Sequence, residues 1–166
     1  MPSFRHHLAW VECQKNDWTT HKPTCRPLST GTWATLTFRL HMPGTEHLIN
    51  TIVTHTGGLR QIFPEDTDPP ADIHGSEPFI VKLQLGLSQV GKPVPGAAMT
   101  VYDKGKSVYG YVVRRDCLEA YDRAWAECER TGVCGGVKMH RWAKRVGPWK
   151  IKICLDRPPY EQLVRW

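Results

Sequence analysis

Several stretches of this chain alternate apolar and polar residues with a period of two, and this pattern constrains the fold more than any other feature. In residues 32–40 the apolar Leu36, Phe38 and Leu40 fall on one side. In residues 149–155 apolar residues again take every second position, with lysines between them. Successive side chains of a strand point to opposite faces, so this alternation indicates half-buried β-strands. The sequence therefore predicts a largely β body.

Further segments favour strands and hairpins. Residues 48–53 are apolar and β-branched, and residues 79–85 form another apolar run. Residues 99–103 and 108–113 flank a short loop that contains glycine, which predicts a β-hairpin. A final hairpin is expected from residues 137–143 and 149–155, with its turn at Arg145-Val146-Gly147-Pro148.

One segment has a helical pattern, from residue 117 to about residue 131. Its apolar residues recur at helical spacing: Leu118, Tyr121, Trp125 and Cys128. Asp116 with Glu119 predicts an N-terminal capping pair, and Gly132 predicts a left-handed C-terminal cap. The expected fold class is therefore α+β, with antiparallel β hairpins, one main helix packed on them, and a short helical finger-like segment before them.

The length of 166 residues fits one ordinary domain and a small appendage. We expect a finger-like segment at residues 1–27 and an α+β domain at residues 28–166. Within that domain, residues 64–78 hold four prolines, five acids and no Lys or Arg, which predicts a solvated loop. The net charge is +6, so the chain outside this loop carries about +11, a balance that permits contact with nucleic acid or acidic partners.

Three potential metal ligands lie near the N-terminus at the spacing Cys-x7-His-x3-Cys. They are Cys13, His21 and Cys25. Thiolate and imidazole groups are the ligands that tetrahedral zinc uses in small structural sites. The segment from about residue 11 to residue 20 reads as a short helix, and Pro23 makes a regular helix beyond residue 22 unfavourable.

The order Cys13-Gln14-Lys15-Asn16-Asp17-Trp18-Thr19-Thr20-His21-Lys22-Pro23-Thr24-Cys25 resembles the second half of a MYND-type zinc finger. Residues 135–149 and 153–158 are similar to the C-terminal part of fungal proteins of unknown activity that carry such a finger. The resemblance implies a module with eight ligands and two interleaved zinc ions. Cys13, His21 and Cys25 match its last three ligands, whereas Ala9 stands where a further ligand belongs.

The same resemblance places Cys13 on one zinc ion and both His21 and Cys25 on the other. Neither set is complete, so zinc, the one implied cofactor, is expected to bind weakly or not at all in the family's geometry. A structural zinc contributes about 10–16 kcal/mol to a finger peptide, most of which an incomplete site loses. The alternatives are one rearranged site with His6 or His7 as substitute ligand, a metal-free helical segment, or a natural protein that supplies the first half from upstream.

The final predicted hairpin is strongly basic and contains aromatic residues. Its cations are Lys138, Arg141, Lys144, Arg145, Lys150 and Lys152, and they cluster with Trp142 and Trp149. Cations beside aromatic rings can hold the phosphates and stacked bases of nucleic acids. The alternative is a solvated sheet face whose lysines protect an edge.

These features lead to two functional hypotheses. MYND fingers bind short proline-containing peptides, so the resemblance implies a protein-interaction or adaptor role. The alternative is nucleic-acid binding through the basic hairpin. No catalytic activity is expected, because the sequence shows no nucleotide-binding loop and no triad or paired-carboxylate motif in a recognisable context.

We also expect an intracellular protein, in the nucleus or cytoplasm. The N-terminal residues contain no long apolar stretch of the kind that a secretory signal needs. No apolar run approaches the roughly 18 residues that cross a bilayer, so no membrane partner is expected.

Overall fold

The computed structural model describes residues 28–53, 59–105 and 107–159. The chain divides into two units, residues 1–31 and 32–166, and the second contains every strand discussed below. In chain order the described elements are η1 (Leu28–Thr30), β1 (Trp33–Arg39), β2 (Asn50–Val53), β3 (Leu59–Ile62), β4 (Phe79–Gln84), β5 (Met99–Asp103), β6 (Tyr109–Val112), η2 (Arg114–Asp116), α3 (Leu118–Thr131), α4 (Val133–Gly136), β7 (Lys138–Gly147) and β8 (Lys150–Cys154). The predicted finger-like helix and its ligands lie outside the described residues.

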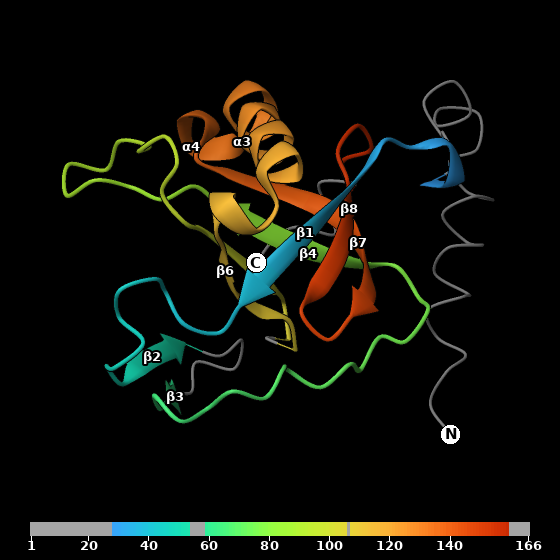
Figure 1. Cartoon of the computed structure of the whole chain (residues 1–166). Helices are drawn as coiled ribbons and strands as arrows, with labels where there is room; N and C mark the ends of the chain where they lie inside the picture. Colours follow the sequence, from blue (N-terminus) through green and yellow to red (C-terminus); the bar gives the residue numbers. More distant parts are fainter. Residues whose placement is uncertain (1–27, 54–58, 106, 160–166) are drawn as a thin grey trace. The chain divides into compact units, whose positions relative to one another are not determined.

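Six antiparallel strands close into a barrel in the order β1-β6-β5-β4-β7-β8, and β8 pairs back with β1 (Figure 1). Strands β4, β5 and β6 follow one another as neighbours. After α3, the β7–β8 hairpin joins β4 to β1 and completes the wall. Each barrel strand thus has a neighbour on both sides, which removes the free edges that promote unwanted strand pairing.

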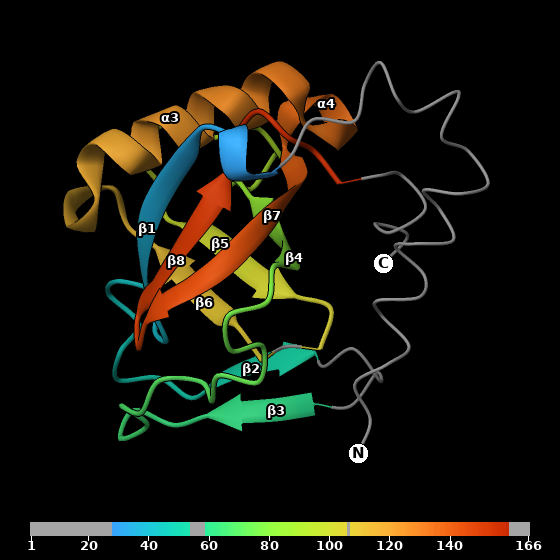
Figure 2. The same cartoon turned by 90° about the vertical axis from the view of Figure 1, so that its right-hand side faces the viewer.

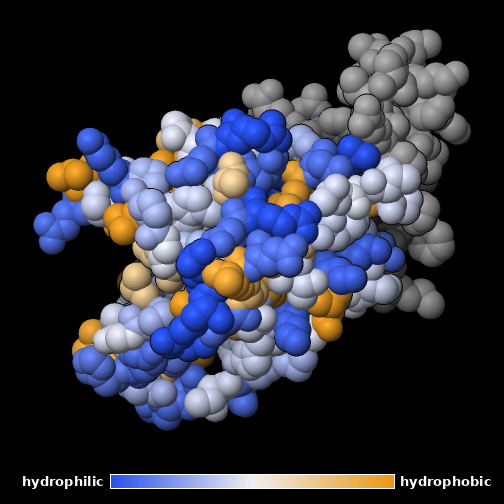
Figure 3. All heavy atoms as spheres, turned by 45° about the horizontal axis from the view of Figure 1, so that its top comes forward, coloured by the Kyte–Doolittle hydropathy of each residue, from blue (hydrophilic) through white to orange (hydrophobic). Residues whose placement is uncertain are grey.

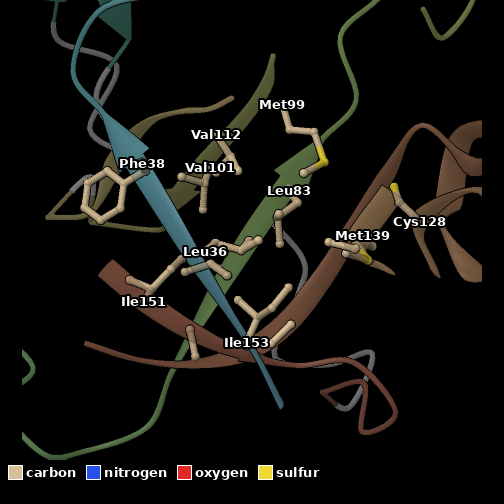
Figure 4. Packing of buried hydrophobic residues seen from close by; sticks show 14 of the residues in the cluster. Leu36, Phe38, Leu83, Met99, Val101, Val112, Cys128, Met139, Ile151 and Ile153 are labelled. Atoms are coloured by element: carbon tan, nitrogen blue, oxygen red, sulfur yellow. The ribbon is translucent and has the colours of Figure 1, made fainter. Parts of the chain in front are cut away.

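The apolar side chains of the predicted period-two alternation fill the interior of the barrel. Buried and half-buried residues alternate along β1, β4 and β5. Leu36, Leu83, Val101 and Ile151 are fully buried, and Figure 4 shows Leu36, Leu83 and Ile151 pointing into the shared interior from β1, β4 and β8. The broad α+β prediction is therefore consistent with the structure, which is mostly β: a six-stranded antiparallel barrel with one main helix.

Helix α3 covers one end of the barrel (Figure 2). It buries Tyr121, Ala124, Trp125 and Cys128, whereas Leu118, which was predicted to belong to the apolar stripe, is largely exposed. Only three of the four predicted stripe residues are buried. Ala124 joins them because it lies three residues after Tyr121 on the same helix face.

The predicted N-terminal cap is wrong, and Gly132 is the C-cap residue as predicted but does not have the predicted left-handed conformation. The N-cap residue is Cys117 and no side chain caps the helix there, because Asp116 instead binds Arg39 of β1 at 2.5 Å. Gly132 has an extended backbone, with φ −69° and ψ 155°. Glycine is needed there for close approach, since an added Cβ would lie 2.4 Å from the carbonyl oxygen of Cys128 and 2.7 Å from that of Lys138.

The two short strands β2 and β3 form a separate antiparallel ribbon near the other end of the barrel (Figure 2). A second apolar cluster there contains Leu40, Ile62 and Tyr109, with Tyr102 and Trp149 packed against it. The sequence predicted a strand at β2 but not at β3. Residues 64–78 form no helix or strand, as predicted.

The β4–β5 connection, residues 85–98, extends as an arm at the left of Figure 1. Leu87 and Pro93 form an isolated bridge within it, and Leu87, Val90 and Val94 are exposed. Figure 3 shows hydrophobic residues among hydrophilic ones along this arm and a mostly hydrophilic surface elsewhere on that face. Among the described residues, no helix is long and apolar enough to cross a membrane.

Candidate nucleic-acid interface

The wall of the barrel is basic. Its six strands contain eight Lys and Arg residues and one acidic residue, Asp103. Asp103 is 3% exposed and faces the interior side of β5. The outer side of the described wall therefore carries no carboxylate. The remaining described acids lie on η2, on α3 and in the connecting segments, mainly residues 64–78.

The centre of the basic surface is a pair of lysines on neighbouring strands. Lys144 of β7 lies directly opposite Lys152 of β8. Lys150 points to the same side as Lys152, because the two are separated by two positions along β8. Lys150 and Lys152 are exposed and Lys144 is half-buried. We call Lys144, Lys150 and Lys152 the lysine face; Figure 2 views β1, β8 and β7 from their outer side.

The surroundings of the lysine face leave its charges uncompensated. On β1, Thr35 lies opposite Lys152 and Thr37 lies opposite Lys150, so the next strand contributes hydroxyl groups and no acid. No described carboxylate forms an ion pair with any of the three lysines. Like charges directly opposite in a sheet are destabilising, by a few tenths of a kcal/mol to about 1 kcal/mol. An anionic ligand would relieve this repulsion.

An aromatic row borders the lysine face. Trp142 lies two residues before Lys144 on β7 and points to the same outer side. Trp33 of β1 lies opposite Cys154 of β8, one row further along the wall. Both tryptophans are half-buried, and Ile80 of β4 is the partner opposite Trp142.

Arg141 does not belong to this surface. Its side chain is 4% exposed, and its guanidinium donates to Glu127 Oε1 at 2.9 Å, Thr131 Oγ1 at 2.6 Å and the Leu155 carbonyl at 2.9 Å. It joins α3 to β7 and to the segment after β8. Although burial raises the pKa of Glu127, hydrogen bonds from Arg130 and Arg141 outweigh it and hold that pKa below its usual value.

Arg145 and Trp149 are also turned away from the lysine face. Arg145 donates to the backbone carbonyls of Gly147, Pro148 and Pro70, and its guanidinium lies 5.3 Å from the Phe38 ring centroid. A register irregularity between β7 and β8 occurs at this point. Burial lowers the pKa of Arg145. Trp149 contacts Phe38 edge-on, with 5.5 Å between ring centroids.

Lys138 and Lys82 lie further round the wall. Lys138 is opposite Gln84, and Lys82 is opposite both His140 and Tyr102. The Lys82 ammonium is 5.4 Å from the Tyr102 ring centroid. Burial first, and then Lys82 and Arg141, lower the pKa of His140 to about 4. Lys82 was not among the predicted cations, since it belongs to a strand far from the basic hairpin in sequence.

A second polar cluster joins the loop of residues 64–78 to the β5–β6 hairpin. Asp103 Oδ2 accepts from Ser107 Oγ at 2.5 Å and lies 2.9 Å from His74 Nε2, and Ser107 Oγ is 3.0 Å from the same nitrogen. A Ser-His-Asp relay needs the acid and the hydroxyl on opposite ring nitrogens. Here both contact Nε2, so the arrangement ties the loop to the hairpin and lacks the order of a relay.

A cavity of about 420 Å³ lies beside this cluster. Its lining includes Ser107, Tyr109 and Arg60 together with acids of the 64–78 loop. The Arg60 guanidinium lies 5.0 Å from the Tyr109 ring centroid, so this cation is already held against an aromatic ring. His74 stacks on Phe79 at 3.9 Å between ring centroids.

The predicted metal ligands Cys13, His21 and Cys25, with His7 as substitute, lie outside the described residues. Within residues 28–53, 59–105 and 107–159, no group of three or more His, Cys, Asp or Glu side chains is placed to hold a metal ion. The geometry of the described part therefore concerns the lysine face and not the finger.

Comparison with known proteins adds no assignment. No protein-family model matches the chain, and no curated protein or solved structure matches it. A functional proposal therefore rests on the chain's own chemistry.

Proposed function

We propose that this protein binds nucleic acid through the lysine face. The observation that carries the proposal is the direct pairing of Lys144 with Lys152 on a wall whose described outer side holds no carboxylate. Opposite charges in such positions stabilise a sheet, whereas like charges destabilise it. A phosphate between the two ammonium groups would replace their repulsion with two attractions.

The positions of the other cations support a compact site. Strands lie about 4.8 Å apart and successive residues on one face about 7 Å apart, so three lysines occupy an area that one or two phosphates span. The acids of α3 and of residues 64–78 lie on other elements, although the 64–78 loop reaches the turn end of β7, where Arg145 donates to the Pro70 carbonyl. No described carboxylate of these segments forms an ion pair with Lys144, Lys150 or Lys152, so their charges stay available to a polyanion.

The test is fluorescence anisotropy with labelled oligonucleotides over a series of salt concentrations. The variant Lys144→Gln/Lys152→Gln is compared with Lys92→Gln/Lys104→Gln, which removes the same charge from two exposed lysines outside β7 and β8. The first variant should weaken binding and reduce the slope of log K against log salt by about 0.7–0.9 for each phosphate that the protein no longer neutralises. The second should leave both the affinity and the slope nearly unchanged.

Equal weakening in the two double variants would show that only net charge matters and would overturn the proposal. Poly-glutamate is added as a competitor in the same assay. If it displaces the oligonucleotide at the same charge concentration, the face recognises any polyanion and nucleic acid is not its specific partner.

A second proposal rests on the sequence of the finger-like segment. The spacing of Cys13, His21 and Cys25 and the resemblance to half a MYND finger support a protein-interaction or adaptor role with a proline-containing peptide as partner. Metal analysis of the purified protein tests the ligand count. Two zinc ions per chain would contradict the incomplete ligand sets, and one would support a rearranged site. A pulldown with proline-containing peptides that retains nothing would contradict the adaptor role.

A further inference from the structure

We infer that the nucleic acid bound by this wall is single-stranded and that Trp142 is the platform on which one of its bases stacks. This inference rests on the proposed function, because the phosphates are held by the lysine face. It specifies the class of nucleic acid and assigns to Trp142 a contribution to binding that does not depend on charge.

The position of Trp142 supports a stacking role. It points outward on β7, next in line to Lys144, at a separation of about 7 Å that matches the scale of one nucleotide. No described aromatic ring stacks on it, whereas Trp125 stacks on Tyr121 and Trp149 contacts Phe38. A base can therefore lie against this indole while its phosphate contacts the lysines.

The strand topology disfavours binding of this wall in the major groove of a DNA duplex. The major groove of DNA admits a helix or a free two-stranded ribbon. The β7–β8 hairpin is not a free ribbon, because β7 also pairs with β4 and β8 also pairs with β1. The only long helix in the described part, α3, carries four acids, Glu119, Asp122, Glu127 and Glu129, against two arginines, Arg123 and Arg130, so its net negative charge disfavours a phosphate backbone.

A single strand meets neither obstacle. Its backbone can follow the surface of the wall, and its unpaired bases can turn toward an aromatic side chain. Thr35 and Thr37 of β1 lie opposite Lys152 and Lys150, where their hydroxyl groups can donate to phosphate oxygens. The footprint that these groups define is short, about two phosphates, which corresponds to a salt slope of about −1.4 for a single strand.

The experiment measures binding of one labelled oligonucleotide as a single strand and as a duplex with its complement. We expect the single strand to bind at least tenfold more tightly. Trp142→Leu should weaken single-strand binding about tenfold with an unchanged salt slope, because it removes stacking and no charge. Trp142→Phe, which keeps an aromatic ring, should retain most of the affinity.

Circular dichroism and thermal melting of each variant verify that the wall is intact before binding is compared. Duplex binding as tight as single-strand binding, or a Trp142→Leu variant with unchanged affinity, would overturn this inference. If either result is obtained but the Lys144→Gln/Lys152→Gln variant still weakens binding, the proposed function is retained and only the inference about single strands and Trp142 is rejected. Absence of binding to both forms of the oligonucleotide would instead refute the proposed function and this inference together.

Discussion

The buried guanidinium of Arg141 leads to a quantitative prediction about stability. We consider Arg141→Met, which keeps a side chain of similar length and removes the charge and all its hydrogen bonds. In the native protein this guanidinium joins Glu127, Thr131 and the Leu155 carbonyl, so one side chain connects α3 with β7 and with the segment after β8.

The expected loss of stability depends on the partners that Arg141→Met leaves without a hydrogen-bond donor. Removing one partner of a buried ion pair costs about 3–5 kcal/mol. Glu127 keeps its contact with the exposed Arg130 at 2.7 Å, which places this case at the lower end of that range. The Leu155 carbonyl also loses a donor, and an unsatisfied buried acceptor costs about 1–3 kcal/mol. Taking the lower end of both ranges, we expect a total near 4 kcal/mol, a large part of the 5–15 kcal/mol typical of a domain.

Urea denaturation followed by circular dichroism measures the change. Arg130→Met is the matched control, because it removes a cation from the same carboxylate at a position that is 69% exposed. It should cost less than about 1 kcal/mol. The double variant Glu127→Leu/Arg141→Met should lose less than the sum of its single variants, since it leaves neither charge buried alone.

Either of two results would show that Arg141 is not a buried tie between α3 and the barrel. One is an Arg141→Met variant no less stable than Arg130→Met. The other is full additivity in the double variant. Because Arg141 is withdrawn from the wall surface, folded Arg141→Met protein should also bind nucleic acid as the wild type does.

Three other predictions follow from local geometry. Gly132→Ala should destabilise the protein by about 2 kcal/mol or more, because its Cβ would overlap backbone at 2.4 Å; thermal melting that shows a neutral change would contradict this close approach. Burial, with nearby cations, lowers the pKa of His140 to about 4, so its contribution to stability is present above about pH 6.5 and is lost as pH falls through 4. Burial raises the pKa of Tyr121 to about 12, so its contribution to stability is present below about pH 10 and is lost as pH rises toward 12. Unfolding free energies measured between pH 3 and 12 should therefore fall at both ends of this range. His140→Gln should reduce the fall at low pH, and Tyr121→Phe should reduce the fall at high pH. His74→Ala should speed proteolysis within residues 64–78, because it removes the tie to Asp103, and an unchanged cleavage rate would show that the cluster does not hold the loop.

Much of the local structure could be predicted from pattern alone. The alternation in β1 and β8 and the helical spacing in α3 identify elements whose inner faces are buried, since side-chain burial is what creates such periodicity. The caps of α3 could not be predicted in this way. Asp116 is drawn to Arg39, which lies 77 residues earlier in the chain, and this long-range ion pair replaces the local cap.

The candidate site was also predictable only in part from the sequence. Strand parity already separates Lys144 from Arg141 and Arg145, because residues an odd number of positions apart face opposite sides of a regular strand. Applying that rule to the basic hairpin would have removed both arginines from the predicted surface. No local rule would have included Lys82, which joins the same wall through the pairing of β4 with β7.

The sequence by itself determined that this protein has strands with one buried face, one amphipathic helix and a basic C-terminal hairpin, because these depend on residue type and spacing within short segments. Only the tertiary structure decided that the strands close into a barrel, since closure depends on contacts such as Trp33 with Cys154, more than a hundred residues apart. Closure gives β7 and β8 a second neighbour each and removes a free edge. It also leaves Lys144 and Lys152 side by side on a wall whose described outer side holds no carboxylate, and that juxtaposition carries the proposed function.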